Sequence, residues 1–253
     1  MPTHMHGQVA LVTGCAAGIG RAIAMEFASQ GTKLVLGDIE AAGGEETAQL
    51  VRAAGCEAIF MRADVTRSAD VAALVAEGVS RFGALDYAVN NAGIEGALMV
   101  PVADYPEATW DKVLSVNLTG VFLCMKHELP HLVKSGGALV NIASVAGLSG
   151  GIMGSAYFAS KHGVVGLTRA AALEYAQKGV RVNAIAPGIV DTPMTQRSIG
   201  HDERAMARAK GMHPLGRLAT AEEVARAAVW LCSPAASFIT GHTLPVDGGY
   251  LVP

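Results

Sequence analysis

Short apolar segments alternate with longer amphipathic segments along most of this chain. The apolar segments predict strands at residues 9–13, 34–36, 58–61, 85–89, 138–142, 180–185 and 242–246. The amphipathic segments predict helices at residues 19–30, 40–54, 68–82, 109–127, 157–177 and 220–231. In the first helix, Ile19, Ile23 and Phe27 are spaced four apart, which puts them on one apolar face.

The predicted strands are rich in Val, Leu, Ile and Ala and do not alternate cleanly with polar residues. Strands of this kind are buried on both faces, as in a parallel sheet that helices cover on each side. Because crossover connections are right-handed, we expect a Rossmann-type, doubly wound α/β fold in three layers. No linker rich in Pro, Ser or Gly divides residues 1–253, so they are predicted to form a single domain.

Local signals mark two helix starts and one irregular segment. Thr220-Ala221-Glu222-Glu223 matches a capping box, and Ser68 is expected to cap the helix at residues 68–82. Residues 191–214 fit no regular pattern and carry four Arg or Lys residues, three Met and two Pro. A long irregular segment of this kind is usually functional or mobile.

The composition narrows the class of protein. Of 253 residues, 51% are hydrophobic and 16% are charged, which argues against general disorder. A net charge of −3 without a long basic segment argues against nucleic acid as the main partner. We expect no membrane span, because no window approaches about 18 uncharged apolar residues. The four cysteines are scattered and the start has no secretory pattern, so we expect reduced thiols, no metal site and a cytoplasmic location.

A glycine-rich turn follows the first predicted strand, in Thr13-Gly14-Cys15-Ala16-Ala17-Gly18-Ile19-Gly20. Glycines allow a tight turn, and the helix that follows offers backbone N–H groups and a positive dipole end to a pyrophosphate. The spacing G-x-x-x-G-x-G departs from the G-x-G-x-x-G fingerprint, and no Gly-Lys-Ser/Thr follows as in a P-loop. A purely structural turn is the alternative interpretation.

Asp38 closes the second predicted strand, 20 residues beyond Gly18. A carboxylate at this place can accept hydrogen bonds from both hydroxyls of an adenosine ribose and would repel a 2′-phosphate. No Arg or Lys is adjacent to Asp38 in the sequence to offset that repulsion. We therefore predict NAD rather than NADP as cofactor; an exposed turn residue is the alternative.

Four further polar residues could form a proton-transfer site. Tyr157 and Lys161 are four apart and share one helix face, Ser144 follows the fifth predicted strand, and Asn117 lies in the helix at residues 109–127. A phenol has a reference pKa of about 10, and a nearby ammonium favours the phenolate. Tyr157 could then exchange a proton with an alcohol or a carbonyl oxygen, to which Ser144 could also hydrogen bond. Each of these features by itself is common in solvated helices, caps and turns.

Together these residues resemble the single-domain, roughly 250-residue form of the short-chain dehydrogenase/reductase family. The resemblance runs from about residue 7 to residue 250 in the order of the family. The matching motifs are the glycine-rich turn, Asp64-Val65, Asn90-Asn91-Ala92-Gly93, Asn117, Ser144, Tyr157 with Lys161, Pro187-Gly188 and Asp247-Gly248-Gly249. No catalytic residue of the family pattern is missing.

The resemblance implies a role for each matching position. Gly14, Gly18, Ile19 and Gly20 would shape the pyrophosphate turn, and Asp38 would hold the adenosine ribose. Asp64 and Val65 would meet the adenine, Asn91 would border the cofactor, and Val190 and Thr192 would contact the nicotinamide carboxamide. Tyr157 would be the acid/base, Ser144 would orient the substrate oxygen, Lys161 would bind the nicotinamide ribose and lower the pKa of Tyr157, and Asn117 would keep a water in a proton path to Lys161.

The predicted function is an NAD-dependent oxidoreductase that transfers a hydride between the cofactor and a secondary alcohol or ketone. The residues expected to line its pocket are mostly apolar, which favours an uncharged, alicyclic substrate; among them are Ile94, Leu98, Met99, Leu148, Ile152 and Met153. The alternatives are an NADPH-dependent 3-ketoacyl-type reductase and a non-catalytic NAD-binding module. The resemblance also implies a homotetramer.

Overall fold

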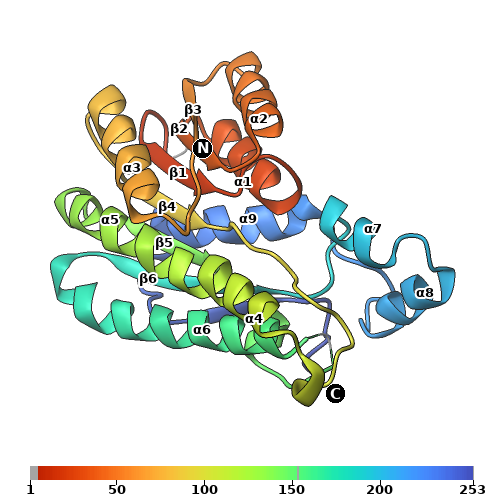
Figure 1. Cartoon of the computed structure of the whole chain (residues 1–253). Coiled ribbons are helices and arrows are strands. Elements are labelled where there is room, and N and C mark those ends of the chain that lie inside the picture. Colours follow the sequence, from red (N-terminus) through yellow and green to blue (C-terminus); the bar gives the residue numbers. More distant parts are fainter. Residues whose placement is uncertain (1–4, 153, 253) are drawn as a thin grey trace.

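The computed structural model describes residues 5–152 and 154–252, in which strands and helices alternate along the chain (Figure 1). The strands are β1 (Val9–Thr13), β2 (Lys33–Asp38), β3 (Ala58–Arg62), β4 (Tyr87–Asn90), β5 (Ala138–Ile142), β6 (Arg181–Pro187) and β7 (Thr243–Val246). They form one sheet in the order β3-β2-β1-β4-β5-β6-β7, and every neighbouring pair is parallel. The predicted doubly wound parallel sheet is confirmed.

Helices cover both faces of this sheet and complete the three layers (Figure 1). They are α1 (Gly18–Ser29), α2 (Ala41–Ala53), α3 (Ser68–Phe82), α4 (Glu107–Leu114), α5 (Gly120–Ser135), α6 (Ser155–Tyr175), α7 (Pro193–Ile199), α8 (Glu203–Gly211) and α9 (Ala221–Cys232). Buried side chains of α1, α2 and α9 form the core on one face, and those of α3, α5 and α6 form the core on the other. The strand order reverses between β1 and β4, and in such sheets ligands bind outside the carboxyl ends of the strands at this point.

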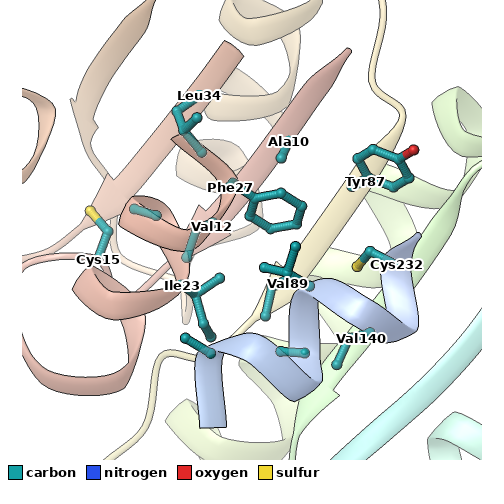
Figure 2. Close-up of a cluster of buried hydrophobic side chains, with 14 of the residues drawn as sticks. Ala10, Val12, Cys15, Ile23, Phe27, Leu34, Tyr87, Val89, Val140 and Cys232 are labelled. Carbon is teal, nitrogen blue, oxygen red and sulfur yellow. The ribbon is translucent and has the colours of Figure 1, made fainter. Parts of the chain in front are cut away.

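β1 shows why polar and apolar residues do not alternate in the predicted strands. All five residues of β1 are buried; Ala10 and Val12 face the core that contains Phe27, and Val9 and Leu11 face the opposite core. Figure 2 shows the first of these cores, where Phe27 of α1 stacks on Tyr87 of β4 with ring centroids 5.9 Å apart. Burial on both faces removes the polar half of the alternating pattern.

The helix predicted at residues 109–127 is longer and is interrupted. α4 passes into a π-helical turn, Ser115–Thr119, and then into α5, which continues beyond the expected end and contains Pro130. Gly136, in the left-handed conformation with φ of 65°, ends α5. The π turn inserts one extra residue per turn, which the apolar spacing does not reveal.

The capping predictions had mixed outcomes. The capping box of Thr220 and Glu223 at the start of α9 is confirmed. The prediction for Ser68 is wrong: the N-cap of α3 is Arg67, and no side chain caps this helix. The Ser68 hydroxyl is instead 2.9 Å from His127 Nε2 on α5. The hydroxyl expected to cap the helix therefore makes a tertiary hydrogen bond.

Residues 191–214, expected to be irregular, contain the short helices α7 and α8. The Thr192 hydroxyl accepts a hydrogen bond from Thr195 N (3.4 Å) at the start of α7. The Asp202 carboxylate accepts from Arg204 N and Ala205 N at the start of α8. The seven residues of α7 are too few for helical periodicity to stand out in the sequence.

A polar cluster lies within the core between β4, β5, α5 and α6. Asn90 Nδ2 donates to Glu128 Oε2 (3.0 Å) and to Asn141 Oδ1 (3.1 Å), and Asn141 Nδ2 donates to Thr168 Oγ1 (2.9 Å). Within the described ranges, Glu128 Oε1 and Asn90 Oδ1 have no hydrogen-bond partner. Complete burial outweighs the hydrogen bond from Asn90 and raises the pKa of Glu128 to about 8.

This cluster predicts a loss of stability as the pH rises. Between pH 4.5 and about 8 the unfolded chain releases the Glu128 proton while the folded chain keeps it, so the free energy of unfolding falls by at most about 1.4 kcal/mol per pH unit. Glu128→Gln should remove this contribution. We expect urea unfolding at pH 5 and pH 8 to show a smaller loss for E128Q than for the wild type, by about 2 kcal/mol or more. Equal losses would contradict the assignment, and E174Q, at an exposed position on α6, is the control.

Candidate active site

Asn91 ties the end of β4 to the glycine-rich turn after β1. Its backbone N–H donates to Thr13 Oγ1 (3.1 Å), and its amide Nδ2 donates to the carbonyls of Thr13 (3.2 Å) and Gly14 (2.9 Å). Gly14 has φ of 68°, and a Cβ there would lie 2.8 Å from Ala92 Cα. A Cβ at Gly20 would lie 2.0 Å from the Gly14 carbonyl oxygen. The backbone path therefore requires both glycines.

The start of α1 is suited to an anion. Its N-cap, Ala17, makes no side-chain hydrogen bond, and no acidic residue lies in the first turn, which contains Gly18, Ile19 and Gly20. The positive end of the helix dipole is thus not offset by a carboxylate of this turn. Thr192, which precedes α7, lies beside the turn, because its Cγ2 would be 3.3 Å from a Cβ at Gly18. A phosphate group fits this combination of N–H groups and dipole.

Asp38 lies at the end of β2 and is bonded to the same turn. Its Oδ2 accepts a hydrogen bond from Ala16 N (2.8 Å), and its Oδ1 accepts from Glu40 N (2.9 Å). Arg62 is its register partner on β3. Adjacency in the sequence did not reveal this arginine, because only the pairing of β2 with β3 brings it to the same sheet edge.

Asp64 and Val65 follow β3. Asp64 Oδ1 accepts hydrogen bonds from the backbone N–H (2.9 Å) and the hydroxyl (2.7 Å) of Thr66. Burial raises the pKa of Asp64, but these hydrogen bonds and nearby arginines outweigh it, so the pKa is lowered overall. Val65 is buried against α5, where a Cβ at Gly120 would lie 2.8 Å from Val65 Cγ2.

Ser144, Tyr157 and Lys161 are brought together at the carboxyl end of β5. Ser144 follows this strand, and its side chain interacts with that of Tyr157, on α6, in a way that lowers the pKa of the phenol. Lys161 is buried one turn further along α6, and its Nζ donates to the Ile142 carbonyl (2.8 Å). The same Nζ lies 5.6 Å from the centroid of the Tyr157 ring.

Burial dominates the protonation of Tyr157 and Lys161. It raises the pKa of Tyr157; the hydrogen bond with Ser144 opposes this shift, and the negative charge of Glu95 adds to it. Burial lowers the pKa of Lys161 to about 8, so its ammonium is still mostly protonated at neutral pH. The pKa of Tyr157 is therefore raised overall, because desolvation of the phenolate is the largest cause of the shift, and the expected lowering by Lys161 stays a prediction.

Asn117, in the π-helical turn, fastens the loop after β4. Its Oδ1 accepts from Ile94 N (2.8 Å), and its Nδ2 donates to the Ile94 carbonyl (2.8 Å) and to Ser160 Oγ (3.3 Å). Both polar atoms of the side chain are thus engaged by this loop or by α6. Its implied role in holding a water near Lys161 stays a prediction.

The segment after β6 contacts the loop after β4. Val190 is buried and forms a bridge with Ala219. From α7, the Ser198 hydroxyl donates to Glu95 Oε2 (2.5 Å), which joins α7 to the loop after β4. Sequence motifs did not identify Glu95, because its partner lies 103 residues away.

Of the residues expected to line a pocket, Met99 and Ile152 are exposed, and Met153 lies outside the described residues. A separate cavity of about 600 Å³ opens at the other end of the sheet, among Gln8, Tyr87 and Arg181, and contains none of the predicted site residues.

Among the described residues, no group of three His, Cys, Asp or Glu side chains could hold a metal ion. No described helix is long and apolar enough to cross a membrane.

Known proteins match this chain along nearly its whole length. A family model described as "Enoyl-(Acyl carrier protein) reductase" matches residues 14–251. The chain is 46% identical to cis-4-hydroxycyclohexanecarboxylate dehydrogenase of Sinomonas cyclohexanicum over 244 residues, covering 96% of each chain. It is 42% identical to 2,5-dichloro-2,5-cyclohexadiene-1,4-diol dehydrogenase of Sphingobium indicum over 248 residues, covering 97% of this chain and 98% of the relative.

The crystal structure of levodione reductase has the same fold. It superposes with a TM-score of 0.94 at 40% identity, covering 97% of this chain and 98% of the other. The solved structure therefore has the fold of this chain. The two relatives match 96% and 97% of its length. The chain belongs to the short-chain dehydrogenase/reductase family and is an oxidoreductase.

Proposed function

We propose that this enzyme is an NAD-dependent dehydrogenase that interconverts a secondary alcohol on a six-membered carbon ring and its ketone. The observation that carries this proposal is the cluster of Ser144, Tyr157 and Lys161 at the carboxyl end of β5. This cluster lies at the same edge of the parallel sheet as the glycine-rich turn and Asp38.

The residues of the turn suit a dinucleotide. The uncapped first turn of α1, with Gly18, Ile19 and Gly20, would take the pyrophosphate. Asp38 would bind the adenosine ribose, and Lys161 would bind the nicotinamide ribose. The remaining residues of the proposed cofactor site are Gly14, Asp64, Val65, Asn91, Val190 and Thr192. When bound, the nicotinamide ring supplies or accepts the hydride of the reaction.

Tyr157 would handle the proton of the reaction. In oxidation it takes the hydroxyl proton of the alcohol as the hydride leaves the carbinol carbon, and in reduction it donates that proton to the carbonyl oxygen. Burial favours the protonated phenol, which is the form that donates in reduction, whereas oxidation needs the phenolate. The interaction with Ser144 favours the phenolate, and the ammonium of Lys161 one helical turn away would add to that effect. The Ser144 hydroxyl would hold the substrate oxygen against Tyr157.

The substrate class rests on the relatives' names and on the apolar residues near the site. Both relatives are named for hydroxylated six-membered rings. Ile94, Leu98 and Leu148 are half-buried near the site and would pack against such a ring. The 3-ketoacyl-type reductase that uses NADPH is less compatible with Asp38, and a non-catalytic binding module would not need Ser144, Tyr157 and Lys161 together.

Removing the phenol hydroxyl tests the proton-transfer step. Tyr157→Phe should lower kcat for oxidation of cyclohexanol by about 1000-fold, because it deletes the acid/base group. Binding of NAD, measured by calorimetry, should stay within a factor of about three. Y175F, at another tyrosine of α6, is the matched control and should keep full activity. Normal turnover by Y157F would exclude this residue from the mechanism.

Cofactor choice is tested at the end of β2. The double variant Asp38→Ala/Ile39→Arg removes the carboxylate and adds a guanidinium beside Arg62, at a position where Ile39 is exposed. We expect the ratio of kcat/KM for NAD to that for NADP to fall at least about tenfold, because the repulsion of a 2′-phosphate is replaced by attraction. E40Q should leave this ratio unchanged. An unaltered ratio in the double variant would count against Asp38 as the determinant.

We also propose a homotetramer. Phe122 on α5 and Leu173 on α6 are 48% and 84% exposed, and such apolar side chains are suited to burial between subunits. Light scattering after gel filtration should give a mass near four times 26.0 kDa. Leu173→Glu should yield smaller species, because it places a charge in the expected interface. A wild-type mass near that of one chain would contradict the proposal.

A further inference from the structure

Glu95 lies in a loop that is held against the catalytic helix at two points. Ile94, its neighbour, is fastened by both side-chain polar atoms of Asn117. Gly93, two residues earlier, faces the ammonium of Lys161, since a Cβ at Gly93 would lie 3.7 Å from Lys161 Nζ. On the other side of Glu95, the Ala97 carbonyl oxygen would be 2.5 Å from a Cβ at Gly154, three residues before Tyr157.

A serine of α7 holds the carboxylate of Glu95. Ser198 Oγ on α7 is 2.5 Å from Glu95 Oε2, and both side chains are half-buried. This hydrogen bond joins the loop after β4 to α7. Among the described residues, Ser198 is the hydrogen-bond partner of this carboxylate, which leaves Oε1 able to accept from a ligand.

Within residues 5–152 and 154–252, the carboxylate of Glu95 forms no ion pair. The five ion pairs formed by the described residues do not include Glu95. The basic side chains of α8, Arg204, Arg208 and Lys210, are exposed. The loop that carries Glu95 lies beside Lys161 and the start of α6, and the negative charge of Glu95 is among the causes that raise the pKa of Tyr157. A substrate oxygen bonded to Tyr157 would therefore lie within the field of Glu95.

We propose that Glu95 is a specificity-determining residue: its carboxylate, aligned by Ser198, accepts a hydrogen bond from a second hydroxyl group of the substrate and disfavours substrates that carry a carboxylate. The proposal rests on the proposed function and narrows its substrate class to neutral ring alcohols, with diols preferred. One relative is named for an anionic substrate and the other for a diol. If Glu95 has this role, this chain should prefer the second kind of substrate.

Three substrates and matched variants test this role. Values of kcat/KM with NAD are measured for cyclohexanol, cyclohexane-1,4-diol and cis-4-hydroxycyclohexanecarboxylate. In the wild type, the value for the carboxylate should be at least about tenfold below that for cyclohexanol, and the value for the diol should be the highest. Glu95→Gln keeps the shape and removes the charge, so the penalty on the carboxylate should shrink by about tenfold. Ser198→Ala keeps the charge, so it should retain that penalty while the preference for the diol falls.

A second readout separates a specificity role from a merely structural one. Glu95 and Lys161 are the charged residues placed against Tyr157, and Glu95 disfavours its phenolate. E95Q should therefore shift the pH dependence of kcat/KM for cyclohexanol oxidation to lower pH, whereas E107Q should not. E107Q makes the same change at an exposed position in the first turn of α4 and is the control for net charge.

The outcomes are distinct. If E95Q lowers kcat/KM equally for all three substrates and leaves the pH profile in place, Glu95 only holds α7, and the specificity role is overturned. A wild type that oxidises the carboxylate as well as cyclohexanol overturns it too, while the proposed function survives. A wild type inactive on all three substrates with either dinucleotide overturns the proposed function and this inference with it.

Discussion

The hydrogen bonds from the Asn91 amide to the Thr13 and Gly14 carbonyls are the constraint on which the site depends. They close the gap between β1 and β4, the two strands at which the order of the sheet reverses. A Cβ at Gly14 would collide with Ala92, so the turn can approach β4 this closely only with glycine. The end of α1 that we propose binds the pyrophosphate, and the loop that carries Glu95, both start from this junction.

Three ionisable side chains near this junction, or in the core beside it, are shifted in pKa by burial. Lys161 is buried with its ammonium on the Ile142 carbonyl, and its pKa falls to about 8. Tyr157 is biased toward the neutral phenol by burial and by Glu95. Glu128 behaves differently, because it lies inside the core and its raised pKa affects stability. The site thus holds a cation and an anion near one phenol, and the field of such a pair can sort substrates by charge.

The limits of prediction from sequence follow from the range of each interaction. The capping box at Thr220 is local and was predicted, and so was the one-turn spacing of Tyr157 and Lys161. Ser68 was assigned to a cap because nothing nearby in the sequence indicates His127, its partner on α5. Arg62 and Glu95 were missed for the same reason, since strand pairing and the contact with α7 bring them to the site.

The alternation of strands and helices along most of the chain, the burial of the strands on both faces and the family were determined by the sequence alone, because apolar periodicity and glycine spacing are local properties of the chain. Only the tertiary structure decided how far burial shifts Tyr157, Lys161 and Glu128, and which residues face one another across the site. The physical reason is that desolvation and Coulomb energies depend on distances between segments far apart in the chain, and those distances exist only once the sheet has formed.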